Sequence, residues 1–396
     1  MSELTVKVEP GLLQGSIVPP PSKSDAHRAL ICANLAGSPD SVKGIIEPVS
    51  DDIETTRGCM SALLGNESVI DCRESGTTLR LMLPLAASLG KQVEFTGCGR
   101  LPQRPLREYL SIFAGHGAEL EFTSGYSLPV RVHGLLHAGR FLVPGNISSQ
   151  YISGLLLALP LLEGDSEIFM TSPLESAPYV DMTISTMQKF GVKCNREAGG
   201  FSVPGGQNYK SCSYEVEADY SQAAFWLTAA FAGSNLDVEG LANDSVQGDR
   251  AIIDLLSDFS QGRKEYVIDV SQIPDLVPIL AVAAALTPAK TRLTNASRLR
   301  LKESDRLKST RTSLNLIGAD IREENDGLFI IGGKNLNGGR ADAFGDHRIA
   351  MALAIAALST TEGVIITGAH AVTKSYPDFF DQLRRLGGNC HEFDLG

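Results

Sequence analysis

Basic and hydroxyl side chains stand together immediately before stretches of the sequence that are rich in Ala and Leu. Six such polar segments each precede an apolar stretch: residues 22–25, 74–78, 148–150, 219–221, 274–275 and 346–348. A Ser or Asp at a helix start usually caps the helix by accepting a backbone N–H hydrogen bond. Capping explains the oxygen atoms, but it does not explain the nearby cations Lys23, Arg80 and Arg348. Because a helix N-terminus attracts anions, several such helix starts brought together would form an anion-binding site.

Further basic residues fall in three segments without helical periodicity, residues 100–105, 298–306 and 373–377. An exposed run of charge is usually only a solvated face of a protein. Here the three runs accompany six polar helix starts, and their joint occurrence favours the binding of anionic ligands.

Two carboxylates lie within this basic constellation. Asp275 begins an apolar stretch that has no other charge before Lys290. Glu303 follows Lys302 and precedes Asp305. Asp275 could simply cap a helix. An acid among phosphate-binding cations repels the ligand, however, so both carboxylates also fit a catalytic role or the binding of a hydroxyl group.

The elements that must position these residues repeat along the chain. Successive polar segments recur at intervals of roughly 50 to 75 residues, which predicts an internal repeat of one supersecondary unit. A helix that is apolar on every side must be buried. Between the apolar stretches lie amphipathic segments that end at a Gly, as helices often do, and short β-rich segments. The pattern predicts an α/β protein with three repeats in each half, in which sheets enclose internal helices.

Length and composition limit the class of protein. A chain of 396 residues is too long for one ordinary core, so two domains with a cleft are expected. The net charge of -11 argues against a nucleic-acid binder. The amino terminus does not read as a signal peptide, and no apolar run reaches the roughly 18 residues of a membrane span, which predicts a cytoplasmic protein. Seven scattered cysteines fit neither a disulfide framework nor a zinc site.

With these residues assembled, the sequence resembles the EPSP synthase family over essentially its whole length. The motifs that carry the resemblance stand in the family's order: Pro21-Ser22-Lys23-Ser24 to Arg28, Ser75-Gly76-Thr77-Thr78-Leu79-Arg80, Arg104-Pro105, Ser148-Ser149-Gln150, Lys302-Glu303-Ser304-Asp305-Arg306-Leu307 and Asp346-His347-Arg348-Ile349-Ala350-Met351. Any one motif would be weak, whereas six in order are specific.

The resemblance implies two similar domains, each of three βαβαββ units with buried helices, an inside-out α/β barrel. It implies a double-crossover hinge, with residues 22–217 in the N-terminal domain and residues 1–21 plus 218–396 in the C-terminal domain. The first domain would hold mainly shikimate 3-phosphate. The second would hold phosphoenolpyruvate and the catalytic acid and base, with the active site in the cleft between the domains.

The resemblance also implies which residues contact the two substrates. Phosphoenolpyruvate is expected to contact Lys23, Gly76, Thr77, Arg104, Gln150, Arg306, His347, Arg348 and Lys374. Shikimate 3-phosphate is expected to contact Lys23, Ser24, Arg28, Ser148, Ser149, Gln150, Ser176, Tyr179, Asp275 and Lys302. Both substrates are anions that repel each other, so bringing them together requires many cations.

In the family's reaction, the 5-hydroxyl of shikimate 3-phosphate adds to the middle carbon of phosphoenolpyruvate while the methylene carbon takes a proton. Loss of phosphate and of a proton from the same methylene carbon then restores the double bond, so an acid and a base are both needed. By motif position, Asp275 acts on the hydroxyl and Glu303 on the methylene carbon, with Lys23 and Lys374 as partners in the proton transfers. The resemblance implies no metal, no cofactor, a monomer and inhibition by glyphosate.

Two other functions stay open from the sequence. The related UDP-N-acetylglucosamine enolpyruvyl transferases use a loop cysteine shortly before an Arg-Pro pair. Here Cys98 is offset from that position, and Ser24 and the motif at residues 302–306 favour shikimate 3-phosphate. A non-catalytic phosphometabolite-binding relative would keep the cations, but the presence of Asp275 and Glu303 speaks against it.

Overall fold

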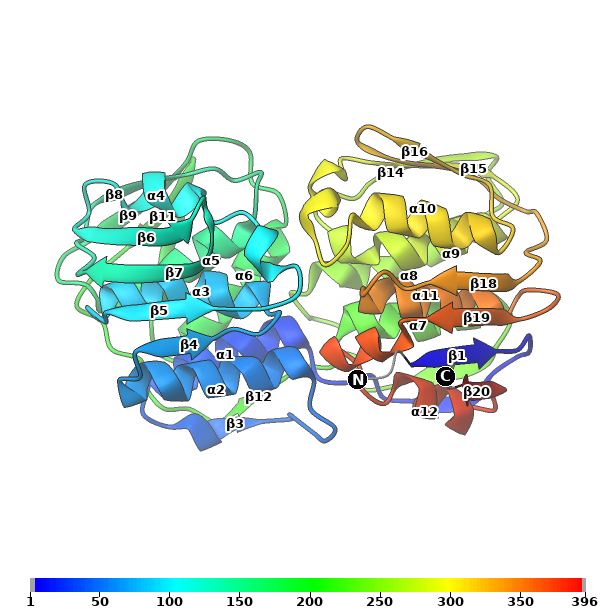
Figure 1. The fold of residues 1–396 in the computed structure, drawn as a ribbon, viewed down its shortest axis with the longest axis horizontal. Coiled ribbons are helices and arrows are strands. Elements are labelled where there is room, and N and C mark those ends of the chain that lie inside the picture. The colour runs from blue at the N-terminus through cyan, green and yellow to red at the C-terminus, as the bar shows by residue number, and fades with distance from the viewer. Residues whose placement is uncertain (1–3, 394–396) are drawn as a thin grey trace. The chain divides into compact units, whose positions relative to one another are not determined.

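The computed structural model describes residues 4–393, which form an α/β protein with two compact units (Figure 1). Unit 2 contains residues 23–47 and 51–217. Unit 1 contains the chain up to Ser22, residues 48–50 and the chain from Ala218 onward. Unit 1 is therefore assembled from segments on both sides of unit 2 in the sequence.

Unit 2 has buried helices inside its sheets. Its helices are α1 (Lys23–Leu35), α2 (Asp51–Gly65), α3 (Gly76–Ser88), α4 (Glu108–Phe113), α5 (Ser149–Ala158) and α6 (Ala177–Lys189). Its strands are β3 (Val42–Lys43), β4 (Val69–Asp71), β5 (Val93–Thr96), β6 (Ala118–Ser124), β7 (Ser127–Gly134), β8 (Arg140–Val143), β9 (Ser166–Met170), β10 (Asn195–Glu197), β11 (Gly200–Val203) and β12 (Tyr214–Glu215). Helix α3 packs against α5 and is buried at every residue except Thr77.

Unit 1 follows the same plan. Its helices are α7 (Tyr220–Phe231), α8 (Ile252–Phe259), α9 (Val277–Leu286), α10 (Arg306–Leu316), α11 (His347–Ala357) and α12 (Phe379–Arg385). Its strands are β1 (Thr5–Val8), β2 (Gln14–Ile17), β13 (Asn235–Val238), β14 (Glu265–Asp269), β15 (Lys290–Thr294), β16 (Ile321–Glu324), β17 (Gly327–Ile331), β18 (Gly339–Asp342), β19 (Val364–Thr367) and β20 (Cys390–Phe393). Helix α11 is buried at every residue, as the prediction for an all-apolar helix requires.

Four sheets repeat one pairing pattern, which accounts for the repeat seen in the sequence. Their strand orders are β4-β5-β7-β6 and β8-β9-β11-β10 in unit 2, and β14-β15-β17-β16 and β18-β19-β1-β20 in unit 1. In each sheet the first two strands are parallel and the remaining pairs are antiparallel. Three of these sheets arise from continuous βαβαββ segments, whereas β1 occupies the corresponding interior place in the fourth.

Each unit contains one more repeat beside the two that form its four-stranded sheets. This remaining repeat has fewer strands than the βαβαββ pattern. Its sheet has two parallel strands in the described chain, β12 with β3 in unit 2 and β13 with β2 in unit 1. Each of these pairs joins strands that are far apart in the sequence. All of unit 2 lies between β2 and β13, whereas the two complete repeats of unit 2 lie between β3 and β12. The α/β class and the two similar units predicted from the sequence are confirmed.

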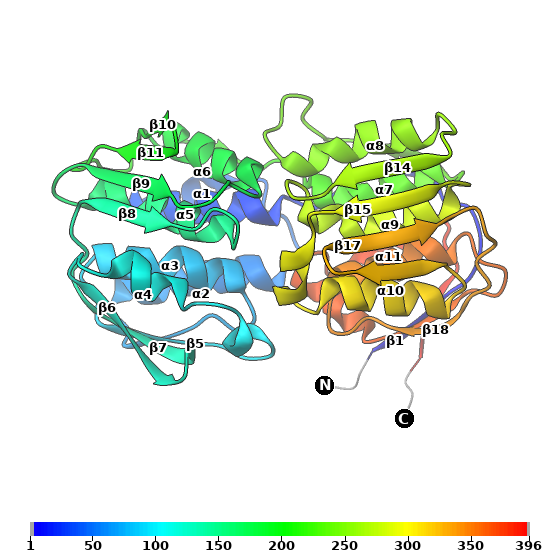
Figure 2. The same cartoon turned by 90° about the horizontal axis from the view of Figure 1, so that it is seen from above.

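The strands cover the buried helices with one face only. Buried and exposed residues alternate along β14 and β8, which is typical of a sheet with one solvated face. Figure 2 shows β14, β15 and β17 lying over α9, and β15 and β17 contact that helix. Gly191, Gly318 and Gly387 follow α6, α10 and α12 with positive φ angles, which is typical of helix C-termini.

Charged side chains are confined to one end of the buried helices. In α1, α3 and α11 every charged residue lies in the first two turns, and α5, α7 and α9 contain no charged residue. Within each unit, the charged side chains of these helices therefore lie where the helices begin.

Candidate functional site

The guanidinium of Arg306, at the start of α10, holds three carboxylates in unit 1. Its side chain is 1% exposed. It donates from Nη1 to Asp275 Oδ1 at 2.9 Å, from Nη2 to Glu303 Oε2 at 2.6 Å, and from Nε to Asp346 Oδ2 at 2.9 Å. A planar guanidinium has five N–H donors, so one Arg can orient several acceptors at once.

Asp275 is shared by three cations. Beside Arg306, it accepts from Arg348 Nη2 at 3.1 Å, and Lys302 Nζ lies 3.5 Å from its Oδ1. Burial alone would raise the pKa of Asp275, but the neighbouring cations, foremost Arg348, hold that pKa well below its ordinary value. Asp275 lies in a short 3-10 turn, Pro274–Leu276, and α9 has Leu276 as its N-cap residue. Asp275 is therefore an ionised ligand of cations rather than the cap of α9.

Helix α7 joins the same group of residues. Arg348 Nη2 donates to Ser221 Oγ at 3.0 Å, and Asp219 caps α7 by accepting from the backbone N–H groups of Ser221 and Gln222. The starts of α7, α10 and α11 and the turn before α9 therefore meet in unit 1.

These residues form a cluster in which positive and negative charges balance. The Arg306 cluster consists of Lys302, Arg306, Arg348, Asp275, Glu303 and Asp346. Only a quarter of the Lys302 side chain is exposed, and this loss of water lowers its pKa to about 8 despite the attraction of Asp275. A positive charge on Lys302 is thus easier to remove than on an ordinary Lys.

Two further residues expected in the site also lie in unit 1. His347 is buried, with Nδ1 3.9 Å from Asp346 Oδ1. Lys374 ends the short 3-10 helix Ala369–Lys374, which packs against α11.

A second group of expected residues lies at the start of α3 in unit 2. Gln150 Nε2 donates to Thr77 Oγ1 at 2.8 Å, and Gln150 Oε1 accepts from Arg80 Nη1 at 2.9 Å. Arg80 therefore orients the amide of Gln150, and this amide in turn holds the first turn of α3.

Arg104 lies against the same helix start. Arg80 Nη2 donates to the carbonyl of Pro105 at 3.0 Å and so holds the loop that carries Arg104. A Cβ atom added to Gly76 would come within 2.6 Å of Arg104 Nη1 and within 3.1 Å of Arg80 Nη1. The absence of a side chain at Gly76 is what allows the Arg104 guanidinium to approach the helix.

A third group surrounds Arg28 on α1. Arg28 is 1% exposed, and it donates from Nε to Thr183 Oγ1 at 2.7 Å and from Nη2 to the carbonyl of Tyr179 at 2.9 Å. Burial lowers the pKa of Arg28 to about 10, which leaves it charged at neutral pH. Ser24 lies one turn earlier on α1. The structure thus brings Arg28 and Tyr179 into contact within unit 2.

The other three expected serines also lie at helix starts. Ser148 caps α5 by accepting from the backbone N–H of Gln150 at 3.3 Å, and Ser149 is the first residue of that helix. Ser176 is the N-cap residue of α6 and has a φ of 55°, an uncommon conformation for a residue with a Cβ. Such conformations cost free energy and concentrate at functional sites.

Sequence reasoning missed three residues that hold the expected ones. Asp346 binds Arg306, and Asp52 pairs with Lys23 at 2.7 Å. Arg80 orients Gln150. The charge of Arg80 and the position of Asp346 in a motif were available signals, but capping sufficed to explain Asp346. Asp52 stands in no motif and gave no signal.

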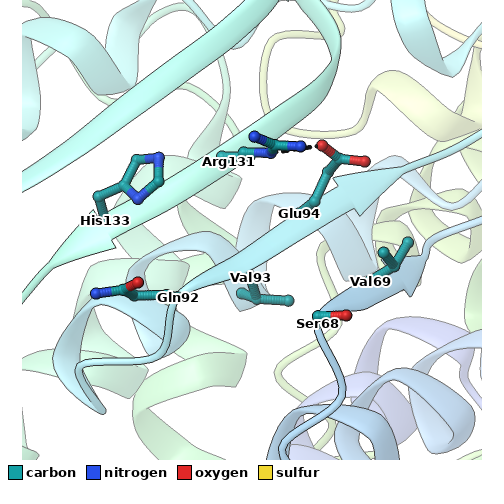
Figure 3. Close-up of a pocket in the computed structure, with 7 residues that line it drawn as sticks. All are labelled: Ser68, Val69, Gln92, Val93, Glu94, Arg131 and His133. Atoms are coloured by element: carbon teal, nitrogen blue, oxygen red, sulfur yellow. Dashed lines mark hydrogen bonds and ion pairs between the residues drawn. The ribbon is translucent and has the colours of Figure 1, made fainter.

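A separate pocket of about 240 Å³ lies on the outer face of the sheet containing β4, β5 and β7 (Figure 3). Its lining residues are Ser68, Val69, Gln92, Val93, Glu94, Arg131 and His133. Arg131 Nε donates to Glu94 Oε2 at 2.7 Å, so these two charges neutralise each other. None of the site residues expected from the sequence lines this pocket, which is therefore separate from the three groups described above.

Grouped metal ligands are absent from the described part of the chain. Among residues 4–393, no three His, Cys, Asp or Glu side chains are grouped so that they could hold a metal ion. Over the same residues, every helix is too short or too polar to cross a membrane.

The contribution of the Arg306 cluster to the stability of the protein can be tested. The change Arg306→Met removes the common partner of three carboxylates and should lower the free energy of unfolding by about 3 to 5 kcal/mol at pH 7. Because the folded-state pKa of Asp275 is depressed, its stabilising contribution is present above its unfolded pKa and is lost as the pH falls. The difference between wild type and variant should therefore stay nearly constant from pH 7 to about pH 5 and narrow as the pH falls below about 4. Urea unfolding at pH 7 and at about pH 3 measures it.

Arg300→Met is the matched control. Arg300 also pairs with two carboxylates, Glu323 and Asp305, but 30% of its side chain is exposed, so its loss should cost at most about 1 kcal/mol. Equal losses in the two variants, or a difference that does not change with pH, would contradict the role given to Arg306.

Comparisons with known proteins agree with these observations. The family model for EPSP synthase (3-phosphoshikimate 1-carboxyvinyltransferase) matches residues 46–383. Relatives named 3-phosphoshikimate 1-carboxyvinyltransferase from Clostridium acetobutylicum and Clostridium novyi are 44% and 43% identical, and each match covers 99% of both chains. An EPSP synthase structure from Acinetobacter baumannii is similar in fold, with a TM-score of 0.80 at 24% identity over 98% of this chain and 100% of that one. The resemblance seen in the motifs is confirmed: the chain belongs to the EPSP synthase family.

Proposed function

We propose that this protein transfers the enolpyruvyl group of phosphoenolpyruvate to the 5-hydroxyl of shikimate 3-phosphate. The products are 5-enolpyruvylshikimate 3-phosphate and phosphate. The observation that carries the proposal is the Arg306 cluster, in which the family's motif cations and both expected catalytic carboxylates are in contact. Kinship over the whole length of the chain supports the same reaction.

Asp275 suits the role of hydrogen-bond acceptor and base for the 5-hydroxyl. Its pKa is held well below the ordinary value, so it carries no proton to donate at neutral pH. A carboxylate that stays ionised can orient the hydroxyl and accept its proton as the oxygen attacks the middle carbon of phosphoenolpyruvate. The proton that the methylene carbon gains must then come from another group.

Glu303 is the group we assign to the methylene carbon. Its Oε2 accepts from Arg306 Nη2 at 2.6 Å, which fixes one oxygen and orients the other. Lys23 and Lys374 remain the proposed partners in the proton transfers. Lys302, with its pKa lowered to about 8, is proposed to hold shikimate 3-phosphate.

Arg306, Arg348 and Arg104 are proposed to bind phosphoenolpyruvate. Guanidinium groups form paired hydrogen bonds with carboxylates and phosphates, which makes Arg suited to a ligand that carries both. In the Arg306 cluster these donors are already oriented by Asp275, so a bound anion must compete with it or share its partners. The other members of the proposed set are Lys23, Gly76, Thr77, Gln150, His347 and Lys374.

Shikimate 3-phosphate is proposed to bind residues of both units, from Ser24 and Arg28 on α1 to Asp275. The other members of the set in unit 2 are Lys23, Ser148, Ser149, Gln150, Ser176 and Tyr179. From the family resemblance we propose that the substrates lie in a cleft between residues 22–217 and the rest of the chain. The same resemblance is the basis for proposing a cytoplasmic monomer that glyphosate inhibits.

An assay of phosphate release from phosphoenolpyruvate tests the proposed function. Release with shikimate 3-phosphate, and none with UDP-N-acetylglucosamine, is the expected result. Release with the second acceptor alone would assign the protein to the other enolpyruvyl transferases. Tight binding of shikimate 3-phosphate without any release would indicate a non-catalytic relative.

Variants of the two carboxylates test their proposed roles in that assay. Asp275→Asn and Glu303→Gln should each lower kcat by about 100-fold to 10,000-fold, because each removes a proton-transfer group while keeping its shape. Calorimetry should show that shikimate 3-phosphate still binds. Asp305→Asn is the control, because Asp305 caps α10 and pairs with Arg300 outside the cluster. A variant that keeps near-normal turnover would remove its residue from the mechanism.

Glyphosate inhibition gives a prediction for Gly76. Gly76→Ala places a methyl group 2.6 Å from the present position of Arg104 Nη1, so the guanidinium must move. Glyphosate is longer than phosphoenolpyruvate, so its inhibition constant should rise by a larger factor than the KM for phosphoenolpyruvate. Competition kinetics on both proteins measures the two factors. An inhibition constant that does not rise would remove Gly76 from the ligand site.

A further inference from the structure

A chain of buried hydrogen bonds links three helices of unit 2. His27 on α1 has its Nδ1 2.5 Å from Thr56 Oγ1 on α2. The Thr56 hydroxyl lies 2.6 Å from Thr78 Oγ1 on α3, and the Thr78 hydroxyl lies 2.8 Å from Ser75 Oγ. Ser75 caps α3 by accepting from the backbone N–H of Thr78 at 3.3 Å. No member of this hydrogen-bond chain is more than 1% exposed.

The hydrogen-bond chain has one direction. Burial, the largest effect, lowers the pKa of His27 to about 3, so its imidazole is neutral and carries one N–H. Its Nε2 has no hydrogen-bond partner among residues 4–393. A buried N–H without an acceptor is rarer than an acceptor without a donor, so the proton belongs on Nδ1. His27 then donates to Thr56, Thr56 to Thr78, and Thr78 to Ser75, and every link is satisfied.

An ion pair runs parallel to this hydrogen-bond chain one helical turn away. Lys23 precedes His27 by four residues on α1, and Asp52 precedes Thr56 by four residues on α2. Lys23 Nζ lies 2.7 Å from Asp52 Oδ2, so α1 and α2 are joined at two successive turns. The contact between His27 and Thr56 continues to α3, because the Thr56 hydroxyl also contacts Thr78. The distance between Lys23 and the start of α3 is thereby set by a continuous set of polar contacts.

We infer that His27 is a positioning residue for phosphoenolpyruvate, which holds the first turn of α3 at a fixed distance from Lys23 through the two threonine hydroxyls. The inference rests on the proposed function, because Lys23 and the first turn of α3 are expected contacts of that substrate. A fully apolar set of side chains could pack here equally well, so the network contributes a defined geometry more than stability. Displacing groups that bind one substrate weakens its binding, which raises its KM and leaves kcat unchanged when the ground state and the transition state lose the same contacts.

Threonine-to-valine variants test the inference, because each removes one hydroxyl and keeps the side-chain shape. Thr56→Val should raise the KM for phosphoenolpyruvate about tenfold, with kcat and the KM for shikimate 3-phosphate changed less than about twofold. His27→Leu should behave in the same way. His27→Asn should keep the wild-type KM, because its amide reaches the position of Nδ1.

Thr55→Val is the matched control on the same helix. Thr55 is also buried, but the hydrogen bond of its hydroxyl runs to the carbonyl of Asp51 in its own helix, at 2.7 Å. This variant should keep the wild-type KM values. The double variant Thr56→Val/Thr78→Val should be no worse than the poorer single variant, because both changes interrupt one hydrogen-bond chain.

The outcomes separate this inference from the proposed function. A wild-type protein without phosphate release would overturn the proposed function, and the inference with it. An active wild type together with an unchanged KM for phosphoenolpyruvate in Thr56→Val, or with equal rises for both substrates, would overturn the inference alone. Fully additive effects of the Thr56 and Thr78 changes would do the same.

Discussion

The structure depends on one constraint: a helix buried on all sides must satisfy its first N–H groups without water. Those groups have no partner within the helix, so a side chain at the helix start has to accept their hydrogen bonds. Ser75 and Ser148 do so in unit 2, and Asp219 and Asp346 do so in unit 1. Capping therefore brings hydroxyl groups and carboxylates to the ends where helix dipoles attract anions. A binding site for anions can grow from the same residues that allow these helices to be buried.

Charge balance explains how so many cations can be kept together. An unpaired guanidinium in the interior is costly, and Arg306 avoids this cost by contacting three carboxylates. The carboxylates among the anion-binding residues therefore have a structural role, because they neutralise buried cations, as well as the proposed role in proton transfer. Asp275 has both, because it orients Arg306 and Arg348 and stays ionised between them.

The sequence predicted the family and the fold class, because six motifs in order and a regular alternation of apolar and amphipathic stretches depend on local chemistry. Features that depend on contacts distant in the sequence were harder to predict. The start of α9 falls after Asp275, since the cations compete for the carboxylate that a cap would use. His27 and Asp52 gave no signal because their partners lie on other helices. The substrate contacts and the division of roles between the domains remain predictions, because they involve ligands and a cleft rather than the fold of either unit.

The place of β1 has a consequence for how the protein is made. This strand lies between β19 and β20, with Val8 opposite both Val364 and Cys390. A ribosome therefore releases β1 long before either neighbour exists, and both edges of that strand lack partners until β19 and β20 have been made. Unit 2, in contrast, has all its strands once Glu217 has emerged. Unit 2 can fold while the chain is still growing, whereas unit 1 must wait until β19 and β20 have emerged.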